Sequence, residues 1–437
     1  MTAHNRPELA RRDSRRAASF VRAVRAVLAV LLVGCLGLVG APAAAADPAS
    51  VQAQQWWIDT LGLRAAWQIS KGAGVTVAVL DSGVDGRFGD LTGAVVPGFV
   101  PGGSGDGRTD TDPTIHGTRM ADEIAGRGTG FGLLGVAPQA KVLPVVIGLD
   151  SAIVDNMVGA LNRLSAMPNP PKVVNISVGA PASCPTELQS AVRTAVDKGM
   201  ILVASAGNEG NGTNLPTLPG DCAGVVAVGA YGDNLTAWPK SQRQPYVALA
   251  GPGVHMVGLY KKTGGIGYAN GTSDAAAIVS GSFALLRAHF PTMPSRQLVA
   301  RVLATARQFQ GAQGSRNDVW GFGAARPHHA LIDTVPASAA NPIYDELDKL
   351  GGPPSTTSSV PGTTGPTGPV SQSGSGSAAP GSSPAAAANS NSSTGVVVAI
   401  GAAVVVVVLI IVGMVLRSRR RRYAQYPPPP GYRPPAP

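Results

Sequence analysis

The sequence predicts an α/β fold of three layers, in which a parallel sheet is covered by helices on both faces. Short, β-branched apolar runs recur along the chain, as at 75–80, 173–178 and 225–228. Segments of helical length separate such runs, as at 153–164 and 187–198. Near-continuous apolar runs are typical of strands buried on both faces, and strands that alternate with helices are typical of parallel sheets.

The N-terminal segment 1–46 has the pattern of a secretory signal peptide. Six arginines lie within 11–25, an apolar run follows at 26–39, and the small residues after it provide a cleavage site. Arg15-Arg16 also permits twin-arginine export, and Cys35 lies in a weak lipoprotein-type box. All of these interpretations predict that the body of the protein is exported.

A second hydrophobic segment, 396–416, is predicted to be a transmembrane helix, because about 20 apolar residues span the roughly 30 Å hydrocarbon core. Arginines dominate the start of 417–437, so the positive-inside rule predicts a cytoplasmic, basic and Pro-rich tail. The segment 336–395 is rich in Pro, Gly, Ser and Thr, which predicts a flexible linker. We therefore expect a single-pass cell-membrane protein whose folded body, 47–335, is extracellular.

The formal net charge of +10 does not indicate nucleic-acid binding. Seven arginines face two acidic residues before residue 47, and six arginines with no acid follow from Arg417 onward. The basic excess therefore belongs to the two ends of the chain. Nucleic acid is not an expected partner of the body.

The chain has three cysteines, of which Cys184 and Cys222 lie in the exported body. In an oxidising compartment a disulfide between them is the default expectation. A metal or redox pair is the alternative, but neither cysteine has a C-x-x-C spacing or a nearby histidine.

Four glycine-flanked motifs carry residue types used in nucleophilic catalysis. They contain Asp81, His116, Asn208 and Ser273, in that order along the chain. Each motif alone has an ordinary interpretation as a turn, a structural histidine or a helix cap. Together they supply a nucleophile, a base, a carboxylate that orients the base, and an amide donor for an oxyanion. Asp81 and Asn208 both follow strand-like runs, which places them at the carboxyl edge of the sheet.

With these motifs the chain resembles the subtilisin-like serine proteases, over about 56–332. The strings VAVLDSGVDG, HGT, ASAGNEG and GTS with a trailing AAxxVSG carry the likeness. When the leader, linker, single span and basic tail are added, the chain is most similar to the mycosins, membrane-anchored subtilases associated with type VII secretion. The resemblance implies a subtilisin-like fold, protein or peptide substrates, and type VII secretion membrane components as partners.

The resemblance also implies roles for individual residues. Asp81 would be the orienting carboxylate, His116 the general acid and base, Ser273 the nucleophile and Asn208 the oxyanion donor. Six further residues would form the walls of the cleft for the substrate residue before the cut: Ser177, Val178, Gly179, Ala204, Ser205 and Ala206. No cofactor or metal is expected. For the acidic loop 106–112 two interpretations remain, a cation site such as calcium and a solvated loop.

The sequence departs from the family pattern at several positions. The family usually has Val-Ala-Gly one residue beyond HGT, but here Arg119 is followed by Met120-Ala121-Asp122. Ala277 stands where a proline is usual. Asp274 directly follows the expected nucleophile, where the family has an uncharged residue. A carboxylate there would oppose the oxyanion and raise the pKa of His116. Two hypotheses follow: activity is weak, or Asp274 selects a basic residue just after the scissile bond.

Three function classes are consistent with the sequence. The leading interpretation is a membrane-anchored serine endopeptidase that processes secreted proteins through an acyl-enzyme. The alternative is a weakly active or inactive subtilase-fold scaffold that stabilises a secretion complex. An adhesion module on a stalk would explain the linker and the anchor but not the four motifs.

Overall fold

The computed structural model describes residues 47–148, 151–261, 265–309 and 316–351. In this part the chain folds around a six-stranded sheet of strand order β2-β1-β3-β5-β7-β8, in which every pairing is parallel. The strands are β1 (Thr76–Asp81), β2 (Lys141–Val146), β3 (Val173–Ile176), β5 (Ile201–Ser205), β7 (Val225–Tyr231) and β8 (Val247–Pro252). The predicted parallel sheet is confirmed.

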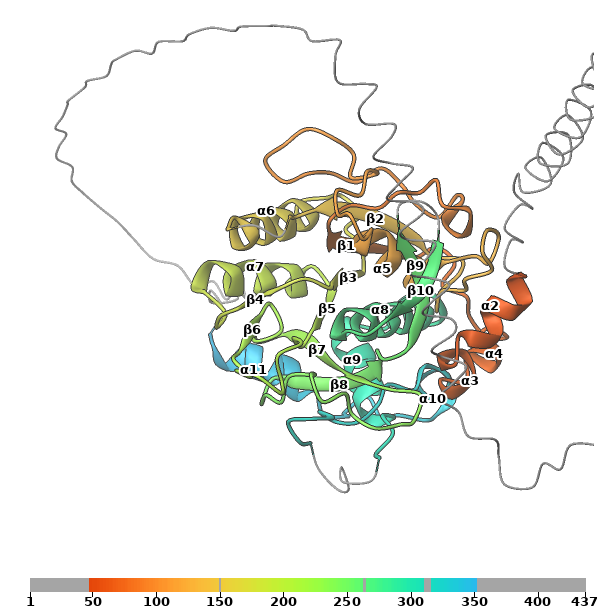
Figure 1. The fold of residues 1–437 in the computed structure, drawn as a ribbon. Helices are drawn as coiled ribbons and strands as arrows, with labels where there is room; N and C mark the ends of the chain where they lie inside the picture. The colour runs from red at the N-terminus through yellow and green to blue at the C-terminus, as the bar shows by residue number, and fades with distance from the viewer. Residues whose placement is uncertain (1–46, 149–150, 262–264, 310–315, 352–437) are drawn as a thin grey trace, which may run out of the picture. The chain divides into compact units, whose positions relative to one another are not determined.

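Helices cover both faces of this sheet (Figure 1). Successive side chains of a strand point to opposite faces, so Val77 and Val79 pack in one apolar cluster while Ala78 and Leu80 pack in another. The first cluster includes α5 (His116–Ala125), α8 (Thr272–His289) and α9 (Ser295–Ala304), and the second includes α6 (Ile153–Ser165) and α7 (Thr186–Asp197). The apolar runs of the strands are continuous because both of their faces are buried.

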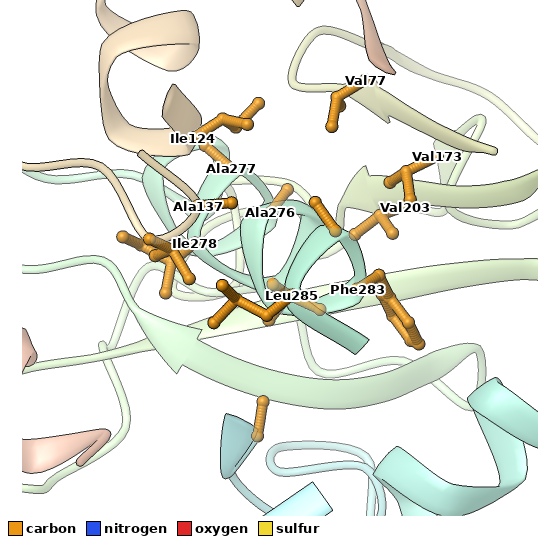
Figure 2. Packing of buried hydrophobic residues seen from close by; sticks show 14 of the residues in the cluster. Val77, Ile124, Ala137, Val173, Val203, Ala276, Ala277, Ile278, Phe283 and Leu285 are labelled. Carbon is orange, nitrogen blue, oxygen red and sulfur yellow. The ribbon is translucent and has the colours of Figure 1, made fainter. Parts of the chain in front are cut away.

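Helix α8 is the centre of the first cluster and is buried from Thr272 to Arg287. Its apolar side chains occur all round the helix, as expected for a helix that is enclosed by protein. Figure 2 shows Phe283 and Leu285 of α8 gathered with valines of the strands. A Cβ at Gly281 would lie 2.6 Å from the Val136 Cβ, so only glycine allows this approach.

Near the start of the described residues, two short helices pack on the body. These are α3 (Trp57–Thr60) and α4 (Leu63–Ala66), separated at Gly62, whose φ of 64° breaks the helix. The Trp57 side chain has no exposed surface. The remaining elements are α2 (Pro48–Gln54), η1 (Gly89–Leu91), β4 (Ala180–Pro181), β6 (Thr217–Leu218), β9 (Met256–Lys261), β10 (Gly265–Ala269), α10 (Pro327–Ile332) and α11 (Pro342–Lys349).

The packed body extends beyond the boundary predicted at residue 335. Helix α11 lies in the first part of the predicted linker, and its Tyr344 and Leu347 side chains are buried. Their spacing of three residues puts both on one face of the helix, which packs on the body. The predicted signal peptide, the rest of the linker, the span 396–416 and the tail lie outside the described residues. Among the helices of the described ranges, none is long and apolar enough to cross a bilayer.

The predicted disulfide between Cys184 and Cys222 is present, with the two Cα atoms 5.0 Å apart. It joins the segment before α7 to the segment before β7, two elements that lie close to one another because β5 and β7 are neighbours in the sheet.

Candidate active site

The predicted catalytic residues lie where parallel strands end and helices begin. Asp81 is the last residue of β1, and Ser177 follows the end of β3. His116 is the first residue of α5, and Ser273 is the second residue of α8, which packs against α5. Because all strands of the main sheet run in one direction, their carboxyl ends share one edge, the usual place for a ligand in such folds.

Asp81 and His116, 35 residues apart in sequence, are joined by hydrogen bonds. The His116 Nδ1 lies 2.9 Å and 3.0 Å from the two carboxylate oxygens of Asp81, whose side chain has no exposed surface. Burial disfavours the charged imidazole, but the Asp81 carboxylate outweighs this and raises the pKa of His116. With its proton held on Nδ1, the imidazole keeps Nε2 free to act as a base.

The acidic loop 106–112 holds this pair in place. Asp110 accepts hydrogen bonds from the Ser82 hydroxyl at 2.8 Å and from the Thr118 amide at 2.8 Å, which ties the turn after β1 to the first turn of α5. Asp112 accepts from the His116 amide at 3.1 Å. Asp110 is buried, so the interpretation as a solvated loop is wrong for this residue.

The carboxylates of that loop therefore serve as structural acceptors. Asp106, at its start, pairs with Arg108. Across the ranges that the structure describes, no group of three or more His, Cys, Asp or Glu side chains is arranged to hold a metal ion.

The Ser273 hydroxyl donates to the Ser177 carbonyl oxygen at 2.8 Å. In return, the Ser177 hydroxyl donates to the Ser273 carbonyl oxygen at 2.9 Å. Among the hydrogen bonds of the described residues, none joins Ser273 to His116. In proteins without a bound substrate such a bond is often long, and it tightens when the substrate binds. Ser273 is 8% exposed, so the hydroxyl is held at the edge of the sheet with little access to solvent.

The Asn208 side chain is oriented by the residue before the nucleophile. Its Oδ1 accepts from the Thr272 amide at 3.0 Å and from the Thr272 hydroxyl at 2.8 Å. A backbone N–H is only a donor, so the oxygen of the Asn208 amide must face Thr272. The Nδ2 group then points away from Thr272 and has two protons to donate.

The six residues predicted to line the substrate cleft have different surroundings. Ser177 contacts Ser273, and Gly179 is exposed at the surface. A Cβ at Gly179 would lie 2.2 Å from the Leu218 carbonyl oxygen, because β4 pairs with β6 there. Ala204 has no exposed surface and packs in the cluster with α6 and α7, so it is a core residue and not a cleft wall. Val178, Ser205 and Ala206 are buried near the strand ends.

Asp274 has no exposed surface. Its Oδ2 lies 3.3 Å from the Arg119 Nη2, and the Arg119 side chain is itself only 13% exposed. The hypothesis that Asp274 contacts a basic substrate residue is therefore wrong for this arrangement. The prediction that Asp274 favours the protonated form of His116 is confirmed in direction. Ala277 packs in the core, as Figure 2 shows.

A family model described as "Subtilase family", peptidase S8, matches residues 72–323. The chain belongs to the subtilase family. The resemblance stated on its motifs is thus confirmed, and the α/β sheet with helices on both faces is the subtilase fold.

Relatives of this subtilase include subtilisin E from Bacillus subtilis, which is 33% identical over 242 residues, or 54% of this chain and 61% of subtilisin E. The chain thus spans less than two thirds of the length of the first curated relatives it matches. Two solved structures are similar to it. MycP1 from the ESX-1 type VII secretion system is 26% identical, with a TM-score of 0.58 and coverage of 70% of this chain and 91% of MycP1. The MycP3 protease from the type VII (ESX-3) secretion system is 30% identical, with a TM-score of 0.55 and coverage of 68% and 91%.

Sequence reasoning missed Glu123, a buried acidic residue beside Arg119 and Asp274. The signal that was present is the spacing of four residues between Arg119 and Glu123, which puts both on one face of α5.

Proposed function

We propose that this subtilase is a serine endopeptidase that hydrolyses peptide bonds of proteins through an acyl-enzyme on Ser273. The observation that carries the proposal is the pairing of a buried Asp81 carboxylate with His116 Nδ1 at the edge of the sheet where α8 presents Ser273. A buried carboxylate that fixes the tautomer of a histidine is the arrangement that makes a base out of an imidazole at neutral pH.

The proposed reaction begins when Ser273 Oγ attacks the carbonyl carbon of the scissile bond and transfers its proton to His116 Nε2. Asp81 stabilises the imidazolium, and the Asn208 Nδ2 and the Ser273 amide donate to the oxyanion. The imidazolium then gives the proton to the leaving amine, and the acyl-enzyme remains. Water, activated by the same imidazole, hydrolyses the ester and restores the serine hydroxyl.

We also propose that the protease domain works outside the cell, anchored by the apolar segment 396–416, and processes proteins at a type VII secretion system. Support comes from the leader-like segment 1–46, from the arginines that follow the apolar segment, and from the structural similarity to MycP1 and MycP3, which belong to type VII secretion systems. The proposed substrates are proteins or peptides, and the proposed partners are the membrane components of that system.

A fluorophosphonate probe tests the catalytic proposal, because it reacts covalently only with an activated serine. The full chain in detergent is compared with Ser273→Ala, His116→Ala and the control Ser190→Ala, an exposed serine on α7. We expect the wild type and the control to be labelled and the two site variants to remain unlabelled. Failure of a folded wild type to react would favour the alternative, an inactive subtilase-fold scaffold within a secretion complex.

A further inference from the structure

Three ionisable side chains are enclosed together beside the proposed nucleophile. Arg119 and Glu123 lie one turn apart on α5, and Asp274 follows Ser273 on α8. Arg119 contacts Asp274 at 3.3 Å. Glu123 is 2% exposed and Asp274 has no exposed surface. These three residues are called the buried charge cluster below, and the proposed catalytic mechanism does not use them.

Strand β9 covers the cluster with a glycine. A Cβ at Gly258 would lie 3.3 Å from the Arg119 Cγ and 3.8 Å from the Glu123 Oε1. The close approach of β9 keeps water from the aliphatic part of Arg119 and from the Glu123 carboxyl. Charges in such an enclosed place interact more strongly than charges at the surface.

The charges of the cluster balance only if it binds a proton. Two carboxylates and one guanidinium would leave one uncompensated negative charge in the interior, which is strongly unfavourable. Three carboxyl oxygens have no hydrogen-bond donor among the described residues: both oxygens of Glu123 and the Oδ1 of Asp274. Two ionised carboxylates have no donor between them, whereas a protonated Glu123 carries an O–H that can donate to the neighbouring Asp274 carboxylate. Consistent with this, burial and the Asp274 charge raise the pKa of Glu123 well above its usual value, although Arg119 lowers it.

The cluster is close enough to act on the proposed base. Arg119 disfavours the charged imidazole of His116, and Asp274 favours it, so the two act on its pKa in opposite directions. The other charged groups that face the cluster are Asp81 from β1, Asp112 from the loop before α5 and, next to Glu123, Asp122. From β9 the contact is Gly258, which carries no charge.

We propose that Arg119, Glu123 and Asp274 form a proton-sharing, charge-neutral cluster that positions the proposed catalytic site for turnover at neutral pH. Arg119 compensates Asp274, and the shared proton keeps Glu123 uncharged, so no net negative charge lies beside the place where the oxyanion forms. At alkaline pH the cluster releases its proton and gains one negative charge, which slows acylation. The inference rests on the proposed function, since it concerns the turnover of that same site.

The pH dependence of kcat and KM for a neutral peptide substrate, from about pH 6 to about pH 10, tests the activity side of this inference. We expect kcat of the wild type to fall at alkaline pH and this fall to disappear in Glu123→Gln, which cannot ionise. Asp122→Asn is the comparison variant, because Asp122 is a second buried carboxyl on α5 whose charge raises the pKa of Glu123. Its removal should therefore shift the alkaline fall to lower pH without abolishing it.

Arg119→Met leaves Asp274 uncompensated, and we expect it to lower kcat about tenfold with little change in KM, as one unit of pKa change corresponds to about tenfold. The double variant Arg119→Met/Asp274→Met removes both charges and should recover most of that loss. If Arg119→Met does not fold, a folded double variant with nearly wild-type kcat still supports the proposal. If the single variant folds and the double variant has an equally low kcat, the proposal is overturned.

A second readout does not depend on turnover. The chain has six histidines, and the ¹³C signal of the His116 ring, assigned with His116→Gln, reports its titration in the full chain in detergent. We expect the pKa of His116 to rise in Arg119→Met and to fall in Asp274→Asn. If these shifts occur in a protein that hydrolyses no peptide, the cluster stands and the proposed function fails. If peptides are hydrolysed while both the pH profile and the titration remain unchanged in the variants, the cluster is merely structural and the inference is overturned.

Discussion

Replacing Asp81 with asparagine keeps the shape of the side chain but removes its negative charge. It also replaces one acceptor oxygen with an NH₂ group, which is a donor. In the wild type both carboxylate oxygens accept from His116 Nδ1, and Oδ1 also accepts from the Ser82 amide at 2.8 Å. In the variant the Ser82 amide can be satisfied only by the remaining oxygen, so the new NH₂ group faces His116. This group would donate to Nδ1, so the imidazole proton would lie on Nε2. A protonated Nε2 cannot accept the proton of Ser273.

We expect Asp81→Asn to lower kcat about 10⁴-fold, because the wrong tautomer removes the base while the oxyanion donors and the substrate contacts remain. This corresponds to about 5.5 kcal/mol of transition-state stabilisation, at 1.36 kcal/mol for each tenfold change. The same change should lower the pKa of His116, since burial then acts without the opposing carboxylate. The loss should therefore persist at all pH values above neutral.

The assay is the rate of acylation by an activated ester, followed in stopped flow with the wild type, Asp81→Asn and the control Asp106→Asn. Asp106 is partly exposed and pairs with Arg108, so its substitution should leave the rate unchanged. Unfolding in urea must show that Asp81→Asn is folded. A folded variant that acylates within about tenfold of the wild type would refute the assignment of His116 as the base.

Three further outcomes are expected. Asn208→Ala should lower kcat by about 10²–10³ with little change in KM, measured by steady-state peptide hydrolysis; this magnitude is that of a lost oxyanion donor in the relative subtilisin and not one worked out from this structure. Gly281→Ala should destabilise the fold by about 1–3 kcal/mol in urea unfolding, because its Cβ would lie 2.6 Å from the Val136 Cβ. Burial and the Asp90 charge raise the pKa of Asp122, so folding binds a proton there, and stability from this group falls as pH rises above about 4. Asp122→Asn should therefore raise the free energy of unfolding at pH 8 more than at pH 5, whereas an equal effect at both pH values would contradict a buried, protonated carboxyl.

Much of the site follows from short sequence patterns, because local chemistry decides it. A β-branched run followed by Asp81-Ser82-Gly83 predicts a buried strand with a turn at its end, and the structure puts Asp81 at that place. His116 opens a helix whose start is held by the acidic loop before it. Parallel strands end at one edge, so residues far apart in sequence meet there without further information.

The rest depends on packing that no local pattern encodes. From the sequence, Asp274 has two possible directions, toward the substrate or into the protein, and only the contact between α5 and α8 decides that it meets Arg119. Glu123 lies at helical spacing from Arg119, but that spacing is equally typical of an exposed pair on a helix surface. Ala204 is a small residue before a glycine-rich turn in the sequence, yet the alternation of β5 points it into the core.

The position of Ser273 at the start of a buried helix has a consequence for how the protein unfolds. Amide groups of α8 are covered by the sheet on one side and by α5, α9 and α10 on others, so they should exchange with deuterium only when the whole domain opens. If the proposed protease activity holds, an opened molecule is a polypeptide that an intact neighbour can digest. Self-digestion should then follow the population of the globally unfolded state instead of the fraying of a loop, and the shelf life of a concentrated sample should track the free energy of unfolding.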